Sequence, residues 1–207
     1  MLKKNRPWEA LINEITELKD RQSGILCDVG TGNGRNMLEL NQTLTLALDI
    51  SFKLLSRYIA SSDHQRILGA LPKLPIRRKS VSDILSVAVL HHLRTEEQRR
   101  AAVEDLRRIN QLLGTLTLTV WRKWRPSNAK KIFQAIRDGR HLIELEDHQR
   151  PWKNSKGEVL AKRFYHYYTW KELYFQLRES QYRIESRKHF GGHSGRDNFF
   201  VKALRRD

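Results

Sequence analysis

Cysteine is almost absent from this chain of 207 residues, and long apolar runs are missing. Cys27 is the single cysteine, which excludes an internal disulfide and a cysteine-rich metal site. The longest apolar runs, such as Ile84 to Leu90, have the length of a strand and fall short of the roughly 20 residues of a membrane span. The first residues carry charge with no apolar segment or cleavage site behind them, so no secretory signal is indicated. We therefore expect a soluble, cytoplasmic protein in which Cys27 is a small buried strand residue.

Acidic residues are scarce relative to basic ones. The chain has 39 Lys+Arg against 23 Asp+Glu, a formal net charge of +16 and a sequence pI near 10.3. Such an excess favours a polyanionic partner, because neutralising phosphates releases counterions and adds affinity whatever the sequence. Nucleic acid is the first candidate. The alternative is a basic surface that serves solubility alone, since net charge governs association and says nothing of the fold.

Short apolar segments alternate with helical patterns along the chain, which has the length of one domain. This alternation predicts a doubly wound, Rossmann-like α/β fold with helices on both faces of a mostly parallel sheet, and we expect 1–207 to form a single domain. Two consecutive strands after the last helix should add an antiparallel hairpin and complete seven strands. We expect strands at 25–29, 44–49, 66–68, 83–90, 115–121, 182–190 and 198–204, and helices at 8–18, 35–40, 52–60, 96–113 and 170–178.

Two of these helices begin with a capping box, in which paired side chains satisfy the first free N–H groups. Thr95 and Gln98 open the first, and Gly114 stands where its end is expected. Its apolar stripe comprises Ala102, Leu106, Ile109 and Leu113. Thr169 and Glu172 open the second.

The stretch 122–168 interrupts the alternation and carries much of the positive charge. It holds 12 Lys+Arg against 5 Asp+Glu, a net charge of +7. We interpret it as a basic, substrate-binding insertion over the mouth of an active site, where basic side chains would steer an RNA backbone. The residues expected to do so are Lys130, Lys131, Arg150 and Lys153.

A glycine cluster follows the first predicted strand. The sequence Asp28-Val-Gly-Thr-Gly-Asn-Gly34 leads into the next helix, and a second acid, Asp49, ends the second strand. Glycine permits a sharp turn and the close approach of a ligand, and a carboxylate at the end of the second strand can accept both hydroxyls of a ribose. The dinucleotide fingerprint requires glycine where this chain has Arg35, and a P-loop requires Gly-Lys-Ser/Thr, which is absent. A glycine-rich turn without a ligand is the remaining alternative to a nucleoside cofactor.

The pattern D-x-G-x-G-x-G resembles the cofactor loop of S-adenosylmethionine-dependent methyltransferases. Four further segments resemble that family: Leu74-Pro75-Ile76, Ser82-Asp83, Val89-Leu90-His91-His92-Leu93 and Leu112-Leu113-Gly114. The resemblance implies S-adenosyl-L-methionine as cofactor, with Asp49 on its ribose and the glycine loop on its methionine end. The cofactor residues it implies are Asp28, Gly30, Gly32, Asn33, Gly34, Asp49, Ile50, Ala70, Leu71, Ala88, Val89 and His92. Many relatives carry an acid at Ala70, so adenine should here be held by the backbone and by Leu71.

Other segments resemble one branch of that family, the tRNA wobble-uridine methyltransferases. They are Arg6-Pro7-Trp8, Trp121, Arg163-Phe-Tyr165-His166-Tyr-Tyr168 and Arg196-Asp-Asn-Phe-Phe-Val201. In that branch the 5-carboxymethyl group of uridine 34 is esterified, and the vertebrate member is fused to an AlkB-like oxygenase. The resemblance implies a tRNA substrate, because arginine can pair with a carboxylate or phosphate and aromatic rings can stack on a loop base. The contacts it implies are Trp8, Trp121, Arg163, Tyr165, His166 and Arg196.

The chemistry implied is in-line attack of an acceptor oxygen on the sulfonium methyl group. A carboxylate acceptor is ionised near neutral pH and needs no general base, so catalysis would come from alignment and desolvation. Ala88, Val89 and His92 are expected to line the reaction side. His91 and His92 are candidates for a base or for substrate orientation, although a structural role at the end of a buried strand is preferred. No metal is expected, because no third ligand lies near the pair in sequence.

The short third strand is expected at an edge of the sheet, where Ile67 and Leu68 would be a liability unless something pairs with them. The resemblance implies a partner for this edge, the small zinc-binding activator subunit shared by several tRNA, rRNA and protein methyltransferases.

Two other functions stay open. A small-molecule O-methyltransferase for quinones or carboxylic acids would not need the charge of 122–168, and a non-catalytic RNA-binding Rossmann scaffold would keep that charge without cofactor affinity.

Overall fold

The computed structural model of this chain describes residues 11–12, 24–34, 36, 44–58, 64–139, 147–153 and 157–207. The side chains of Ser127, Lys131, Trp152, Lys153 and Leu160 are not described. Most of the helices predicted at 8–18 and 35–40 lies outside these ranges, as does Trp8. Within the described ranges, no helix is long and apolar enough to cross a membrane.

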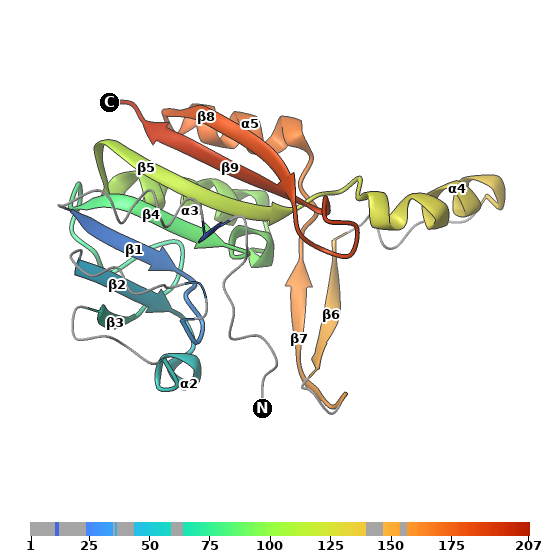
Figure 1. The fold of residues 1–207 in the computed structure, drawn as a ribbon, viewed down its shortest axis with the longest axis horizontal. Coiled ribbons are helices and arrows are strands. Elements are labelled where there is room, and N and C mark those ends of the chain that lie inside the picture. Colours follow the sequence, from blue (N-terminus) through green and yellow to red (C-terminus); the bar gives the residue numbers. More distant parts are fainter. Residues whose placement is uncertain are drawn as a thin grey trace.

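One seven-stranded sheet forms the centre of the molecule, as the alternating pattern predicts (Figure 1). The strands are β1 (Ile25–Val29), β2 (Leu44–Asp49), β3 (His64–Leu68), β4 (Val81–Val87), β5 (Asn110–Trp121), β8 (Tyr182–Phe190) and β9 (Asn198–Arg205). They lie in the order β3-β2-β1-β4-β5-β9-β8, and only the β5–β9 and β9–β8 pairings are antiparallel. The strand order reverses between β1 and β4, and a sheet of this kind binds ligands at the carboxyl ends of the strands beside that reversal.

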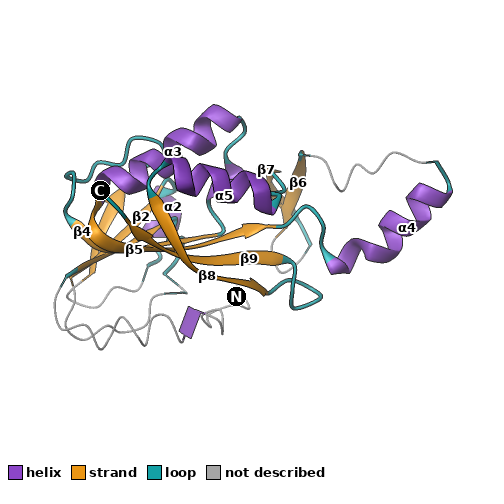
Figure 2. Cartoon of the chain, turned by 90° about the horizontal axis from the view of Figure 1, so that it is seen from above, coloured by secondary structure: helices purple, strands orange, loops and turns teal. Residues whose placement is uncertain are grey.

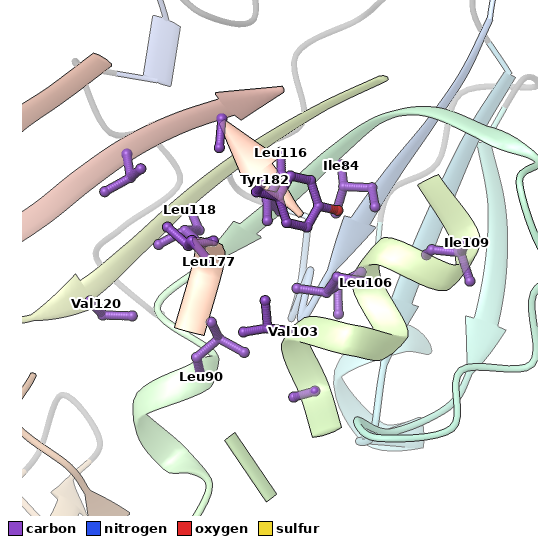
Figure 3. Packing of buried hydrophobic residues seen from close by; sticks show 14 of the residues in the cluster. Ile84, Leu90, Val103, Leu106, Ile109, Leu116, Leu118, Val120, Leu177 and Tyr182 are labelled. Atoms are coloured by element: carbon purple, nitrogen blue, oxygen red, sulfur yellow. The ribbon is translucent and has the colours of Figure 1, made fainter. Parts of the chain in front are cut away.

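The main core lies between this sheet and the helices α3 (Glu96–Ile109) and α5 (Trp170–Glu179), which cover the same face (Figure 2). Figure 3 shows this core, which contains Leu116, Leu118 and Val120 of β5, Leu106 of α3 and Leu177 of α5. Successive strand residues point to opposite faces. A second cluster therefore contains the alternate residues of β4, and its buried members are Leu11, Leu26, Leu85, Val87 and Phe200.

The capping box of α3 is confirmed, but the end of this helix differs from the prediction. Thr95 accepts the N–H of Gln98, and the Gln98 side chain accepts the N–H of Thr95. The helix ends at Ile109 because the buried side-chain amide of Asn110 donates to the backbone oxygens of Val81 and Ser82, which ties the chain to β4. Leu113 is exposed with φ of +58°, and Gly114 lies inside β5. The predicted extension of the apolar stripe to Leu113 was wrong.

The predicted fourth strand is shorter than its apolar pattern. It ends at Val87, because Ala88 has a φ of +61° and leaves the extended conformation. Leu90–His92 then forms a 3-10 turn, η1, before α3. The second crossover helix, α2 (Phe52–Leu55), also ends earlier than expected. The predicted strands at 182–190 and 198–204 are confirmed to within one residue.

The basic stretch 122–168 contains elements that the sequence pattern did not predict. They are η2 (Pro126–Asn128), α4 (Ala129–Arg137), β6 (His148–Lys153) and β7 (Val159–Tyr165). β6 and β7 form a separate antiparallel hairpin, and both this hairpin and α4 extend away from the central sheet in different directions (Figure 1). The base of the hairpin is attached to the sheet, where the His166 N–H donates to the His91 oxygen and the Tyr168 N–H donates to the Trp121 oxygen.

Candidate active site

The turn after β1 folds back over the end of β2. The N–H groups of Gly30 and Thr31 both donate to the Leu48 oxygen, at 2.7 and 2.9 Å. A Cβ on Gly30 would lie 2.2 Å from Cγ2 of Val89, whereas a Cβ on Gly32 would meet nothing within 4 Å. The first glycine therefore lets the turn approach the loop after β4, and the second borders open space where a ligand can approach the backbone.

Asp49 ends β2 and faces this turn. Its Oδ2 accepts the N–H of Gly32 and its Oδ1 accepts the N–H of Ser51, each at 2.8 Å. Because a carboxylate oxygen can accept two hydrogen bonds, both oxygens keep capacity for a ligand. The adjacent hydroxyls of a ribose match this arrangement.

Apolar residues flank the acid on the side away from the turn. Ile50 follows Asp49 and is 75% exposed, and Ala70 and Leu71 follow β3 and are half-buried. The Gly69 N–H donates to the Asp49 backbone oxygen at 3.1 Å, so this loop is held beside the end of β2. The surface suits a flat apolar ring such as adenine.

The opposite side of the turn contains buried polar groups. Asp28 is 1% exposed within β1, while Asn33 and Gly34 are half-buried in the turn. Thr31 Oγ1 and Asn36 Oδ1 are also buried and have no hydrogen-bond partner among the residues that the structure describes. Since an unpaired buried oxygen is costly, these atoms indicate a place that a polar ligand would complete. The residues predicted for S-adenosylmethionine in this region lie at or after the carboxyl ends of β1, β2 and β3, and their chemistry fits its polar tail, ribose and adenine.

The loop after β4 supplies the two histidines. Ala88 donates its N–H to both the backbone oxygen and Oγ1 of Thr119, which fixes the loop against β5. His92 Nδ1 lies 2.8 Å from the Phe164 oxygen. Because a carbonyl only accepts, we assign the proton to Nδ1, which leaves Nε2 as an acceptor. Burial lowers the pKa of both His91 and His92, so both rings are neutral near pH 7.

An aromatic layer lies beside the histidines, at the carboxyl end of β5. The rings of Trp121 and Tyr165 stack with centroids 4.5 Å apart. Tyr165 also stacks on His91 at 5.6 Å and meets the edge of His92 at 4.8 Å. The structure therefore brings together four residues that the sequence assigned to the substrate or the reaction side.

Two arginines lie over the same layer. Arg150, predicted to steer an RNA backbone, has its guanidinium carbon 5.8 Å from the ring centroids of both Trp121 and Tyr167. Arg125 lies closer, at 5.2 Å from Trp121 and 4.7 Å from Tyr167, and is 8% exposed. Sequence reasoning missed Arg125, because nothing in its local sequence distinguishes it from the other arginines of this basic stretch.

Other predicted substrate residues are more scattered. His166 is buried, with Nδ1 2.7 Å from Asp147 and Nε2 2.9 Å from Glu172, so both ring nitrogens are engaged within the protein. Arg163 is half-buried in β7, Arg196 is exposed before β9, and Lys130 is exposed on α4. Lys131 and Lys153 have side chains that are not described, and Trp8 lies outside the described residues. The part of the chain that is described holds no metal-binding group of three or more His, Cys, Asp or Glu.

Comparisons with known proteins agree with this geometry. Residues 27–118 match a family model described as a methyltransferase domain. The chain is 35% identical over 127 residues to a tRNA (carboxymethyluridine(34)-5-O)-methyltransferase of Arabidopsis thaliana, a match that covers 56% of this chain and 31% of that protein. It is 28% identical over 181 residues to a protein of Encephalitozoon cuniculi (strain GB-M1) named as a methyltransferase, covering 87% of this chain and 80% of that protein. The chain thus spans less than a third of the Arabidopsis relative.

Solved structures share the fold at low identity. A SAM-dependent methyltransferase of Methanosarcina mazei has a TM-score of 0.71 and 17% identity, with 93% of this chain and 97% of that chain covered. Magnesium protoporphyrin IX methyltransferase of Synechocystis PCC 6803, with bound SAH, has a TM-score of 0.68 and 13% identity, covering 95% of this chain and 81% of that chain. At such identities the likeness establishes the fold alone.

Proposed function

We propose that this chain is an S-adenosylmethionine-dependent methyltransferase that acts on tRNA at the C5 substituent of wobble uridine 34, forming a carboxymethyl ester. The observation that carries the proposal is that the Asp49 carboxylate bound to Gly32 and the Trp121 ring stacked on Tyr165 both lie where a strand of one sheet ends, β2 for Asp49 and β5 for Trp121. The substrate is inferred from the name of the Arabidopsis relative and from the net charge of +16.

The residues predicted to bind the cofactor have separate tasks in this proposal. Asp49 would accept the ribose hydroxyls, Ile50 and Leu71 would enclose adenine, and the turn from Gly30 to Gly34 would hold the methionine end. When bound, S-adenosylmethionine supplies an electrophilic methyl group on a sulfonium. The half-buried Ala88 and Val89 would exclude water from that group, and charges attract more strongly where water is absent.

The substrate group that accepts the methyl must be oriented toward the cofactor, and it needs no proton transfer. A carboxylate oxygen of the substrate would form a bond to the methyl carbon while the carbon–sulfur bond breaks, so that one negative and one positive charge cancel and no proton moves. Trp121 and Tyr165 would hold the uridine through their exposed parts, because both rings are only half-buried. The acceptor nitrogen Nε2 of His92 would receive a hydrogen bond from the base or its ribose.

The test is to incubate the protein with labelled S-adenosylmethionine and bulk tRNA, with and without an activator subunit, and to identify the labelled nucleoside after digestion. We expect label in a uridine with a modified C5 substituent, and none with the D49A variant. An absence of label in tRNA, with label in acids or quinones when a small-molecule extract replaces the tRNA, would favour a small-molecule methyltransferase. Tight tRNA binding without cofactor affinity would favour the non-catalytic scaffold.

The partner that we propose is the small zinc-binding activator subunit, paired with β3. β3 is one edge of the sheet, and its apolar residue Leu68 is 57% exposed while Ile67 is half-buried. The opposite edge, β8, carries exposed charges at Arg183, Glu185, Arg187 and Lys188, whereas the exposed charged residue of β3 is Arg66. Since charged side chains protect an edge from pairing and apolar ones do not, β3 is the better docking strand.

Gel filtration with such a subunit tests this pairing. We expect coelution at micromolar concentration and its loss in the L68K variant, with K188Q on β8 as the control. Separate elution of the wild-type protein and the subunit would overturn the partner proposal and leave the methyltransferase proposal standing.

A further inference from the structure

Two arginines of the active site share one aromatic surface without an acidic partner. Arg125, four residues after β5, and Arg150, in β6, both lie over Trp121 and Tyr167. Arg150 donates from Nε to Nε2 of His148 at 2.8 Å. Among the described residues, neither arginine forms an ion pair with a carboxylate.

The environment of Arg125 is unusual for a charged side chain. It is 8% exposed, and its Nε has no hydrogen-bond acceptor in the described part of the chain. The acid whose charge acts on it, Asp197, already accepts from the N–H and hydroxyl of Ser194. Burial lowers the pKa of Arg125, and the charge of Arg150 adds to this effect.

Such an arrangement is costly in the protein alone. A buried guanidinium is tolerated when it is paired and hydrogen-bonded, and two like charges beside one another increase the cost. The rings of Trp121 and Tyr167 offset part of it through cation–π attraction. They leave the Nε–H of Arg125 without an acceptor among the described residues, and an oxyanion would supply one with opposite charge and matching geometry.

We propose that Arg125 and Arg150 bind an oxyanion of the nucleotide that is methylated. The inference rests on the proposed function, because it takes the wobble nucleotide as the occupant. That nucleotide offers two oxyanions, the carboxylate of its C5 substituent and its phosphate. Trp121 joins the arginines to Tyr165 and thereby to His92, so the bound anion lies along the same layer as the reaction side.

Three free nucleosides separate these sources when they are titrated into the protein with S-adenosylhomocysteine present. They are 5-carboxymethyluridine, uridine 5′-monophosphate and uridine, and the readout is the dissociation constant by calorimetry. We expect one of the two anionic ligands to bind about tenfold more tightly than uridine. Preference for carboxymethyluridine assigns the site to the carboxylate, and preference for the monophosphate assigns it to the phosphate.

The variants R125Q and R150Q should each reduce this preference to within about twofold, and R125K should retain part of it because it keeps the charge without the planar donors. The control is R183Q, which removes one paired arginine from the start of β8, at the opposite end of the sheet. Thermal unfolding of every variant checks the fold. If R125Q is unstable, the ligand preferences of R125K and R150Q decide whether the arginines bind the anion.

Equal or undetectable binding of all three ligands at millimolar concentration would overturn the inference, as would an undiminished preference in folded R125Q and R150Q. These outcomes differ from failure of the proposed function. The absence of label in tRNA would refute that function whatever the nucleoside affinities are, and a tRNA-methylating enzyme with no preference among the nucleosides would refute this inference alone.

Discussion

Gly30 and Gly32 both have positive φ, of +79° and +60°, but differ in what surrounds them. Alanine at either position is strained, at roughly 1 kcal/mol or more. In G30A the new methyl group would also lie 2.2 Å from Val89. We therefore expect the free energy of unfolding, measured by urea denaturation, to fall by about 1 kcal/mol in G32A and by at least about 2 kcal/mol in G30A.

G32A should lose more cofactor affinity than its small loss of stability would suggest. The reason is that a methyl group on Gly32 would point into the open space where we expect the cofactor to bind. Calorimetry with S-adenosylhomocysteine should show a marked loss for G32A although its fold is nearly intact. Equal stability of the two variants, or wild-type affinity in G32A, would contradict the assignment of the turn.

His91 should make the stability of the protein depend on pH in the acidic range. Burial lowers its pKa, and the charges of His92, His166 and Arg163 lower it further, while the rings of Trp121 and Tyr165 pack beside it. In the unfolded chain the same group titrates near 6.5. As the pH falls below that value, the unfolded state takes up a proton that the folded state does not, so stability is lost by at most about 1.4 kcal/mol per pH unit for one such group.

We therefore expect the Tm to be nearly constant above pH 7 and to fall between pH 6.5 and 5. The variant H91F should have a shallower acid slope, whereas H193F, which replaces an exposed histidine, should keep the wild-type slope. Parallel pH profiles for H91F and the wild type would show that another group is responsible.

At the scale of elements, one imidazole ties the β6–β7 hairpin to the helices of the core, in addition to the backbone hydrogen bonds at its base. His166 follows β7 and lies between Asp147, before β6, and Glu172, in the first turn of α5. Glu172 lies also 3.4 Å from the buried Arg99 of α3. The hairpin that carries Arg150 and Tyr165 is thus tied to two helices of the core.

Replacing His166 by alanine should loosen this hairpin more than the sheet. We expect the free energy of unfolding to fall by about 1–3 kcal/mol, since two partly buried carboxylates each lose one hydrogen-bond partner. Tryptic cleavage should become faster within 148–165, which is rich in Lys and Arg. H189A on β8 is the control, since that side chain is exposed. Cleavage elsewhere at the same rate as in the hairpin would mean that the substitution unfolds the whole domain.

Elements whose pattern is local could be predicted from the sequence, and elements that depend on distant contacts could not. β1, β2 and α3 begin where apolar runs and capping residues mark them. The end of α3 depends on hydrogen bonds from Asn110 to β4, and the end of β4 depends on the positive φ of Ala88. Neither feature leaves a signal in hydrophobic periodicity, so Gly114 was wrongly taken as the helix stop.

The same distinction holds within the site. The residues predicted for the cofactor belong to short contiguous segments with recognisable patterns, and the structure places the described ones at or after the carboxyl ends of β1 to β4. The proposed substrate side is assembled from β5, β6 and β7, which are separated by up to several tens of residues in sequence. Burial of Arg125 and engagement of both His166 nitrogens follow from that assembly, and no residue type or spacing predicts them.

At the scale of the whole molecule, the net charge of +16 is distributed over elements far apart in the fold. Exposed basic residues occur on α4, on β8 and before β9, and α4 extends well away from the sheet (Figure 1). Burial is the largest cause that lowers the pKa of His189 on β8. The charges of Arg122, Arg187 and Arg196 lower it further. A large folded RNA can contact these regions at once, and a small-molecule substrate cannot.

The ionic-strength dependence of binding tests this reading of the charge. If about five phosphates are neutralised, tRNA affinity should fall by roughly 100- to 500-fold between 50 and 200 mM salt, whereas affinity for S-adenosylhomocysteine should change by less than about twofold. Filter binding over that range measures the tRNA affinity, and calorimetry measures the affinity for S-adenosylhomocysteine.

In K130Q on α4, the slope of the logarithm of tRNA affinity against the logarithm of salt concentration should become shallower by about one, since one counterion fewer is released. The paired Arg183 lies at the amino end of the sheet, so R183Q should keep the slope. A tRNA affinity that does not respond to salt would assign the positive charge to solubility, as the sequence also allowed.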